Sequence, residues 1–258
     1  SWWPFIAAFG GSGIYVGAAL LVLAGGDSGL VGSTVGAGVT VGSIALFLGG
    51  IYGWLYHAFV SDFWERGTDK HTDRTLKFAM LLFLGSEIAT FGAGFVYYFI
   101  IRGTDVWTEA PDVFGSLVIF NTVLLLISSV TLHYSHVALL NGDRSKFMKL
   151  LGATLLLGVV FIGGQVYEYY EFIIHEGFTI TQGAYGSAFY GLTGLHGLHV
   201  TMGAVLLGIV FVRAYYGQYS PERHTSVSTA SMYWHFVDVV WVFLVVVLYV
   251  GAEVGAAG

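Results

Sequence analysis

The sequence contains no cysteine, only three prolines and few charged residues. Without cysteine the chain can form neither a disulfide nor a thiolate-bound metal site. Asp, Glu, Lys and Arg make up 10% of the residues, whereas a soluble domain has about 25%. That deficit, together with 56% hydrophobic residues, indicates an integral membrane protein. The net charge of −6 argues against a nucleic-acid partner.

Apolar runs of about 20 residues, the length that crosses a bilayer, recur along the chain. They predict an all-α integral membrane protein with seven transmembrane helices, since no run shows the alternation of every second residue that a barrel strand needs. The predicted spans are residues 3–24, 31–57, 76–101, 115–140, 150–173, 186–212 and 230–252.

The basic residues predict how the chain crosses the membrane. Nine of the ten Lys and Arg residues fall in or beside the second, fourth and sixth loops, and only Arg102 lies beside another loop. Short cytoplasmic loops carry an excess of Lys and Arg. We therefore expect these three loops on the cytoplasmic or matrix side, with the N-terminus inside and the C-terminus outside.

Glycine is abundant, at 37 residues, and is densest in the first two predicted helices. Small residues four positions apart let helix backbones approach closely in a membrane. The pairs with this spacing are Gly13 and Gly17, Gly32 and Gly36, Gly38 and Gly42, and Gly49 and Gly53. They predict a packing face between these two helices, and Gly191, Gly194 and Gly197 predict a similar packing seam on the sixth.

Ionisable side chains inside a span cost at least about 2.5 kcal/mol each, so each one needs a reason. Glu87 lies close to the middle of the third predicted span. It is either a neutral carboxyl hydrogen-bonded to a neighbour, or a carboxyl that handles protons or lines a lipid cleft. Glu168 and Glu171 are three residues apart on the fifth span, with Gln165 one turn earlier. They form either a packing network or a pair that binds metal or shares a proton.

Histidines in the spans occur in pairs at a spacing that puts both on one helix face. The pairs are His133 and His136 near the inner end of the fourth span, His196 and His199 in the middle of the sixth, and His235 with Asp238 near the inner end of the seventh. This pattern favours a buried polar network of interhelical hydrogen bonds, and it also leaves open a metal or haem site.

Two other classes of membrane protein can be weighed against these pairs. A seven-helix retinal protein or receptor needs a lysine deep in its last helix, and no lysine follows Lys149. A membrane di-iron enzyme needs histidines clustered at the membrane face, whereas these histidines are scattered at different depths. A membrane metal enzyme that uses the histidine pairs remains an alternative. Metal analysis of the isolated protein would decide whether it applies.

Several segments, taken in order, resemble subunit III of the haem–copper cytochrome c oxidases. They are Trp3–Pro4, FLGSEIATF at 83–91, NTVLLLISS at 121–129, HYSHVALLNGDR at 133–144, GQVYEYYEF at 164–172, YGSAFYGLTGLHGLHV at 185–200 and YWHFVDVVWVFLV at 233–245. The last two segments are the most specific. The match extends over nearly the whole chain.

The resemblance implies one domain over residues 1–258, with helices one and two at about 3–57 and helices three to seven at about 76–252. The two bundles are expected to enclose a V-shaped, lipid-filled cleft. The implied function is a non-redox accessory subunit of a proton-pumping terminal oxidase in aerobic respiration. It is expected to contact oxidase subunit I directly, to assemble with subunit II, and to contain no catalytic or metal site, since haem and copper lie in these partner subunits.

The resemblance also implies roles for single residues and a membrane. Glu87 matches a buried glutamate at the cleft, while His71 and Arg213 match positions near lipid headgroups, where basic residues attract anionic lipid. The histidines are implied to be structural, and phospholipid is the expected bound molecule. A prokaryotic plasma membrane is expected in preference to the mitochondrial inner membrane. Subunit III of a quinol oxidase is the alternative, although that version typically lacks the first two helices.

Overall fold

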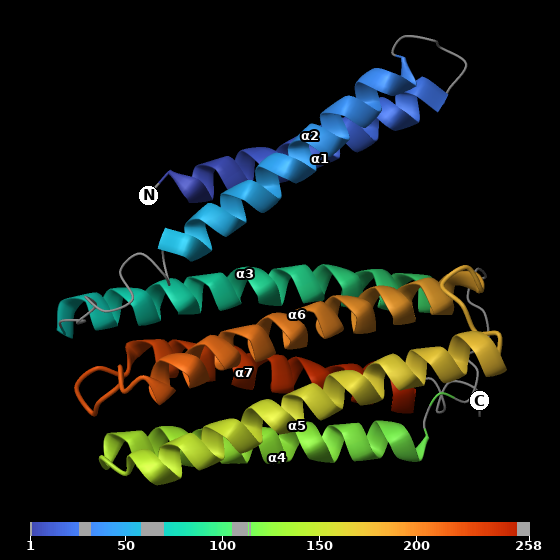
Figure 1. The fold of residues 1–258 in the computed structure, drawn as a ribbon. Coiled ribbons are helices and arrows are strands. Elements are labelled where there is room, and N and C mark those ends of the chain that lie inside the picture. The colour runs from blue at the N-terminus through green and yellow to red at the C-terminus, as the bar shows by residue number, and fades with distance from the viewer. Residues whose placement is uncertain (1, 26–31, 58–69, 105–112, 114, 252–258) are drawn as a thin grey trace. The chain divides into compact units, whose positions relative to one another are not determined.

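The computed structural model describes residues 2–251 apart from 26–31, 58–69, 105–112 and 114 (Figure 1). In this part of the chain seven helices are long and apolar enough to cross a membrane. They are α1 (Trp3–Gly25), α2 (Ser33–Leu55), α3 (Lys70–Arg102), α4 (Ser116–Leu140), α5 (Arg144–Tyr170), α6 (Gly183–Tyr215) and α7 (Thr225–Leu244). The π-helices η2 (Glu171–His175) and η3 (Val245–Val250) continue α5 and α7. The prediction of an all-α membrane protein with seven spans is confirmed.

Three helices begin five or six residues before the predicted spans, which started at residues 76, 150 and 230. The added turns are polar, so a hydropathy pattern excludes them although the helix continues beyond the apolar run. The start of α5 has its own cap, because the Asp143 carboxylate accepts a hydrogen bond from the backbone N–H of Lys146 at 2.9 Å. As a result, His235 lies about 15 Å from the start of α7, farther from that end than the predicted span places it.

The chain forms two compact units, Ser1–Gly67 and Thr68–Gly258. The first holds α1 and α2, which pack through glycines as the Gly13 and Gly17 pair predicts. A Cβ atom on Gly17 would lie 2.7 Å from the backbone nitrogen of Thr40. The prediction is wrong for Gly38, Gly42 and Gly49, which meet no described atom within 4 Å. Gly10 and Gly17, seven residues apart on α1, both lie against the backbone of α2. Gly38 and Gly42 lie on another side of α2.

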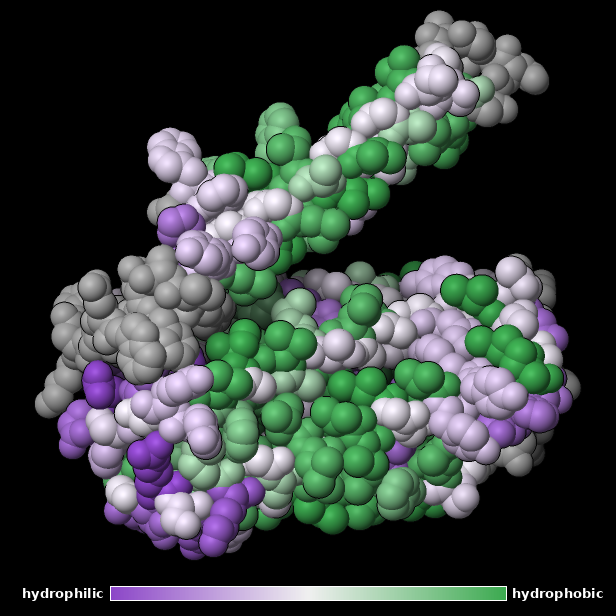
Figure 2. Space-filling view, in the orientation of Figure 1, coloured by the Kyte–Doolittle hydropathy of each residue, from purple (hydrophilic) through white to green (hydrophobic). Residues whose placement is uncertain are grey.

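In the second unit α6 and α7 lie in the middle (Figure 1). Helix α3 packs against both of them. Helices α4 and α5 pack against each other, α4 also packs against α7, and α5 also packs against α6. Successive helices run in opposite directions, so the α4–α5 and α6–α7 connections lie at the same end. Figure 2 shows hydrophilic residues gathered at that end and a hydrophobic band beside it. This distribution suits a protein whose middle lies in lipid.

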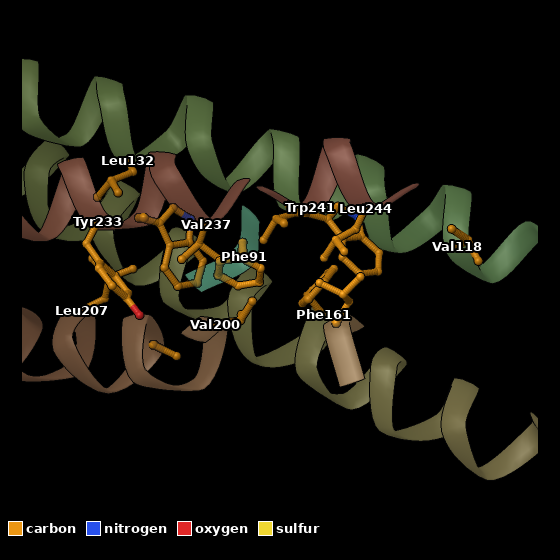
Figure 3. Close-up of a cluster of buried hydrophobic side chains, with 14 of the residues drawn as sticks. Phe91, Val118, Leu132, Phe161, Val200, Leu207, Tyr233, Val237, Trp241 and Leu244 are labelled. Atoms are coloured by element: carbon orange, nitrogen blue, oxygen red, sulfur yellow. The ribbon is translucent and has the colours of Figure 1, made fainter. Parts of the chain in front are cut away.

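Large aromatic side chains fill the centre of this unit (Figure 3). The indole N–H of Trp234 donates to Ser128 Oγ at 2.9 Å, and that of Trp241 donates to Thr122 Oγ1 at 3.0 Å. The Phe161 ring meets Trp241 edge-on, with 4.9 Å between centroids. Both indoles are therefore buried with their polar atom bonded, which removes the main cost of burying tryptophan.

Helix α6 does not use the glycine seam that its sequence suggests. Gly191 and Gly197 meet no described atom within 4 Å, and a Cβ atom on Gly194 would make only an ordinary contact, 3.7 Å from the Tyr169 hydroxyl, so the prediction that the three form a packing seam is wrong within this unit. The buried side of α6 carries large side chains instead. These are Tyr185, Phe189, Leu192, His196 and Val200. The outward glycines leave the α6 surface open, and they widen the space beside α5.

Candidate functional site

Glu87 on α3 and His199 on α6 meet across the packed pair of helices. Glu87 Oε2 lies 2.9 Å from His199 Nε2, and the two side chains are 16% and 11% exposed. The described span of α3 runs from Asp73 to Arg102, so Glu87 is at its middle. Two ionisable groups at this depth satisfy each other, which lowers the cost of keeping either in a membrane.

The second ring nitrogen of His199, Nδ1, is bonded to the backbone, which limits the protonation forms of the pair. Nδ1 lies 2.8 Å from the carbonyl oxygen of Leu195. A carbonyl can only accept, so Nδ1 must carry a hydrogen. The contact between Nε2 and Glu87 then contains one proton, which belongs either to a neutral carboxyl or to an imidazolium beside a carboxylate. In both forms the pair is neutral overall.

Aromatic side chains enclose the Glu87–His199 pair. The Phe91 ring lies 5.0 Å from the His199 ring, between centroids. The hydroxyl of Tyr233 on α7 donates to the backbone carbonyl of His199 at 3.1 Å. Phe91 thus packs against the imidazole, and Tyr233 connects the backbone of α6 at His199 to α7. Tyr233 was not among the residues that the sequence singled out, because a tyrosine in an aromatic span carries no distinguishing pattern.

His196, one turn earlier on α6, has different surroundings. It is fully buried and its ring stacks on Trp241 at 5.1 Å between centroids. Neither ring nitrogen has a hydrogen-bond partner among the described residues. The shared spacing of His196 and His199 therefore does not bring them to one acid, and only His199 meets a carboxyl.

Glu168 lies in a second buried polar cluster, near the C-terminal end of α5. Gln165 Nε2 donates to Glu168 Oε2 at 2.5 Å, and the hydroxyl of Tyr249 on η3 lies beside the same carboxyl. Glu171 begins η2 and is only half-buried. The structure thus separates the two glutamates, with Glu168 inside the bundle and Glu171 near its surface.

His235 and Asp238 occupy a third polar position, between α7 and α4. His235 Nδ1 shares a hydrogen bond of 2.6 Å with Ser129 Oγ, and Asp238 Oδ2 lies 3.9 Å from the same nitrogen. Ser129 was missed by sequence reasoning, although the two adjacent serines in the apolar NTVLLLISS segment give a weak signal. A groove of 450 Å³ runs along this position.

The two residues expected near headgroups lie at the start of α3 and the end of α6. His71 is in the first turn of α3, and its side chain lies outside the described residues. Arg213 is buried at the end of α6, where its Nε donates to Gln218 Oε1 at 2.8 Å.

In the following loop a hydrogen bond from Ser220 lowers the pKa of the Glu222 carboxyl, and burial raises the pKa of the Tyr219 hydroxyl.

The described residues contain no group of three or more His, Asp or Glu side chains placed to hold a metal ion. In the remaining histidine pair, His133 is exposed and His136 Nε2 lies 3.2 Å from Ser228 Oγ on α7. The site that stands out is therefore the Glu87–His199 pair, which joins α3 to α6 at the middle of the α3 span.

Comparison with known proteins places these features in a family. A family model described as cytochrome c oxidase subunit III matches residues 39–253. A cytochrome c oxidase subunit 3 from Thermostichus vulcanus is 38% identical over 174 residues, which cover 66% of this chain and 85% of the relative. One from Synechocystis sp. is 37% identical over 187 residues, covering 71% and 78%. One from Cyprinus carpio is 33% identical over 224 residues, covering 82% of each chain. The chain belongs to the cytochrome c oxidase subunit III family.

Proposed function

We propose that this chain is a non-redox accessory subunit of a proton-pumping haem–copper terminal oxidase. Family membership makes it a membrane-embedded subunit of a haem–copper oxidase complex in the respiratory chain. In the proposal it contacts subunit I directly, assembles with subunit II, stabilises subunit I, binds phospholipid and supports proton uptake. Haem and copper are held by those partner subunits.

The observation that carries the proposal is the Glu87–His199 pair. Oxygen reduction consumes protons in a partner subunit, so a neighbouring chain can assist by holding a proton near an uptake route. The pair holds one proton in either of two neutral forms, and it does so at mid-depth, where an isolated charge is costly. The incomplete burial of both side chains leaves the pair within reach of a molecule outside the second unit.

Basic residues at one end of the second unit support phospholipid binding. Arg144, Lys146 and Lys149 are exposed where α4 meets α5. Such residues attract anionic headgroups at the cytoplasmic surface. In this proposal His71 and Arg213 contribute to headgroup sites at the same end, and acyl chains occupy the expected cleft. The N-terminus is inside, the C-terminus is outside, and the membrane is a prokaryotic plasma membrane.

The proposed electron donor to the complex is cytochrome c. Relatives named cytochrome c oxidase subunit 3 align with most of this chain. The seven described spans include the first two, which quinol-oxidase versions typically lack. Oxygen uptake by the purified complex with reduced cytochrome c, compared with a quinol, decides between these donors. Turnover with the quinol alone contradicts this assignment.

Substitutions of Glu87 test the proton and lipid roles separately. Glu87→Gln keeps a hydrogen-bond donor for His199 Nε2 but cannot release a proton. We therefore expect an assembled complex with normal lipid content and slower steady-state oxygen consumption at high pH, where proton supply limits the rate. Glu87→Ala leaves Nε2 unpaired, and we expect lipid loss and faster inactivation during turnover.

Ser86→Ala is the matched control, because Ser86 is adjacent and bonds only to its own helix at Phe83. The measurements are phospholipid per complex, oxygen consumption against pH, and the lifetime of turnover, with the complex lacking this subunit as reference. Unchanged values in both Glu87 variants would contradict the proposed role of the pair. Purification without any haem-bearing subunit would contradict the proposed function as a whole.

A further inference from the structure

A groove on the second unit lies between α4 and α7, away from the Glu87–His199 pair. We call it the His235 groove, and its volume is 450 Å³. Its walls are mostly apolar, and its polar atoms come from three side chains. The lining residues are Leu126, Ser129, His235, Asp238, Val239, Val242, Phe243 and Val246.

The polar side chains of the groove lie at the middle of the membrane. The span that contains α7 runs from Thr225 to Val250, which puts Asp238 at its centre. Hydrocarbon at that depth is the most costly surrounding for an ionisable group, at least about 2.5 kcal/mol for aspartate. Ionisable residues in spans therefore face the interior of a bundle or another protein chain.

Within this chain the cluster is only partly satisfied. Asp238 is 6% exposed at its side chain, and neither of its carboxylate oxygens has a hydrogen-bond partner in the described part of the chain. The His235 side chain is 40% exposed, and only its Nδ1 atom is bonded, to Ser129. The imidazole thus lies between the buried Asp238 carboxylate, whose Oδ2 atom is 3.9 Å from its Nδ1 atom, and the surface, and its Nε2 atom remains for a group from outside.

Lipid is a poor occupant for this groove. Acyl chains can fill its apolar walls, but they offer no hydrogen-bonding group to His235 at mid-depth. Headgroups offer such groups, but they lie at the membrane surface, about 15 Å away on either side. A transmembrane helix satisfies both requirements, because it presents apolar side chains to the walls and a polar side chain to the imidazole.

We propose that the His235 groove is the docking surface for a transmembrane helix of another oxidase subunit. That helix places a hydrogen-bonding side chain against His235 at mid-membrane depth and packs apolar side chains against Val239 and Phe243. Asp238 and Ser129 act behind the imidazole and hold its orientation. The inference rests on the proposed function, since it requires a membrane-embedded partner.

The first experiment maps what touches the groove in the assembled complex. A photo-crosslinking amino acid replaces Val239, which is 69% exposed in the groove, and in a control it replaces Leu156, which is 65% exposed on α5. We expect position 239 to form a covalent adduct with another membrane subunit of the complex. An adduct with phospholipid only, or with a second copy of this chain, overturns the inference.

The second experiment tests the polar contact. His235→Phe keeps a ring of similar size and removes both nitrogens, whereas His133→Phe changes an exposed histidine on α4 outside the groove. Loss of one interhelical hydrogen bond in a membrane should weaken the binding of this chain to the complex about threefold or more. We therefore expect lower retention of this chain in the complex for His235→Phe. Equal retention of the two variants overturns the polar contact.

These results separate the inference from the function on which it rests. A wild-type complex that contains haem, together with a lipid adduct at position 239, overturns the docking surface and leaves the proposed function standing. A wild-type chain that purifies without a haem-bearing subunit overturns the proposed function instead.

Discussion

A single helical turn separates two histidines with different chemistry. His199 has both ring nitrogens bonded, one to a backbone carbonyl and one to Glu87, while His196 lies among aromatic rings. The difference comes from the helices that each one faces. An aromatic environment favours a neutral ring, whereas a carboxyl favours a shared proton. Of the two positions, only His199 has both ring nitrogens hydrogen-bonded among the described residues.

Sequence reasoning could predict that Glu87 needs a partner, but not which residue supplies it. The depth of Glu87 follows from counting along an apolar run, and the cost of an unpaired carboxyl follows from chemistry. The partner lies on α6, and selecting His199 over His196 depends on the rotation of α6 about its axis. Both histidines fit the same spacing, so only the packed structure distinguishes them.

The packing around Trp234 gives a prediction at the scale of one methyl group. A Cβ atom on Gly158 would lie 2.6 Å from the Trp234 ring, so Gly158→Ala forces the indole to move. Overpacking of this kind costs about 1–3 kcal/mol. We expect a lower thermal midpoint for the purified complex, and a weakened hydrogen bond from the indole to Ser128.

Gly163→Ala is the control for this change, because Gly163 is on the same helix and meets no described atom within 4 Å. Alanine is the better helix former by up to about 1 kcal/mol, so this variant should be neutral or slightly stabilised. Equal destabilisation by the two substitutions would mean that helix α5 is not packed against Trp234 as described.

At the scale of elements, the end of α7 changes from α-helix to the π-helix η3. This wider turn alters the backbone hydrogen bonding, and two tyrosines bond its carbonyl groups. The Tyr98 hydroxyl donates to the carbonyl oxygen of Val247 at 3.1 Å, and the Tyr185 hydroxyl donates to that of Leu248 at 2.8 Å. Side chains from α3 and α6 thus fix the end of α7, beside the buried Glu168.

Removing one of these hydroxyls tests how η3 is held. Tyr185→Phe keeps the buried ring and leaves the carbonyl of Leu248 without that donor, which costs about 1–3 kcal/mol at a buried position. We expect faster amide hydrogen exchange in residues 245–250, measured by mass spectrometry. Tyr134→Phe, at an exposed position on α4, should leave that exchange unchanged. Unchanged exchange in both variants would show that η3 does not depend on this bond.

The hydropathy pattern was sufficient to predict that the helices exist and in what order they occur. It was insufficient to predict where they begin and end. Seven apolar runs became seven helices because lipid leaves the backbone no other way to satisfy its hydrogen bonds. The first turns of α3, α5 and α7 are polar, so their extent depends on caps such as Asp143 and on packing outside the apolar core. The π-helices also have no sequence period of their own, since they follow from contacts with other helices.

At the scale of the whole molecule, the clearest order is the alternating direction of successive helices within the second unit. In the second unit the α4–α5 and α6–α7 connections lie at one end, and the hydrophilic residues gather there. Counting spans and basic residues was enough to predict which connections share an end. Rotation of each helix was not predictable in this way, as Gly38 and Gly42 on α2 demonstrate, because many small residues are compatible with more than one packing face.

The absence of cysteine makes the orientation directly testable. Ser145→Cys lies at the start of α5, and Thr181→Cys lies in the connection between η2 and α6; both positions are exposed. In intact cells whose outer membrane surface is accessible to the reagent, a membrane-impermeant maleimide should label residue 181. It should label residue 145 only in inverted vesicles. The reason is the excess of basic residues on the α4–α5 side. Wild-type chain is the control for background labelling. Labelling of both positions from the same side would break the alternation, whereas the reverse pattern would keep the seven spans and invert the chain.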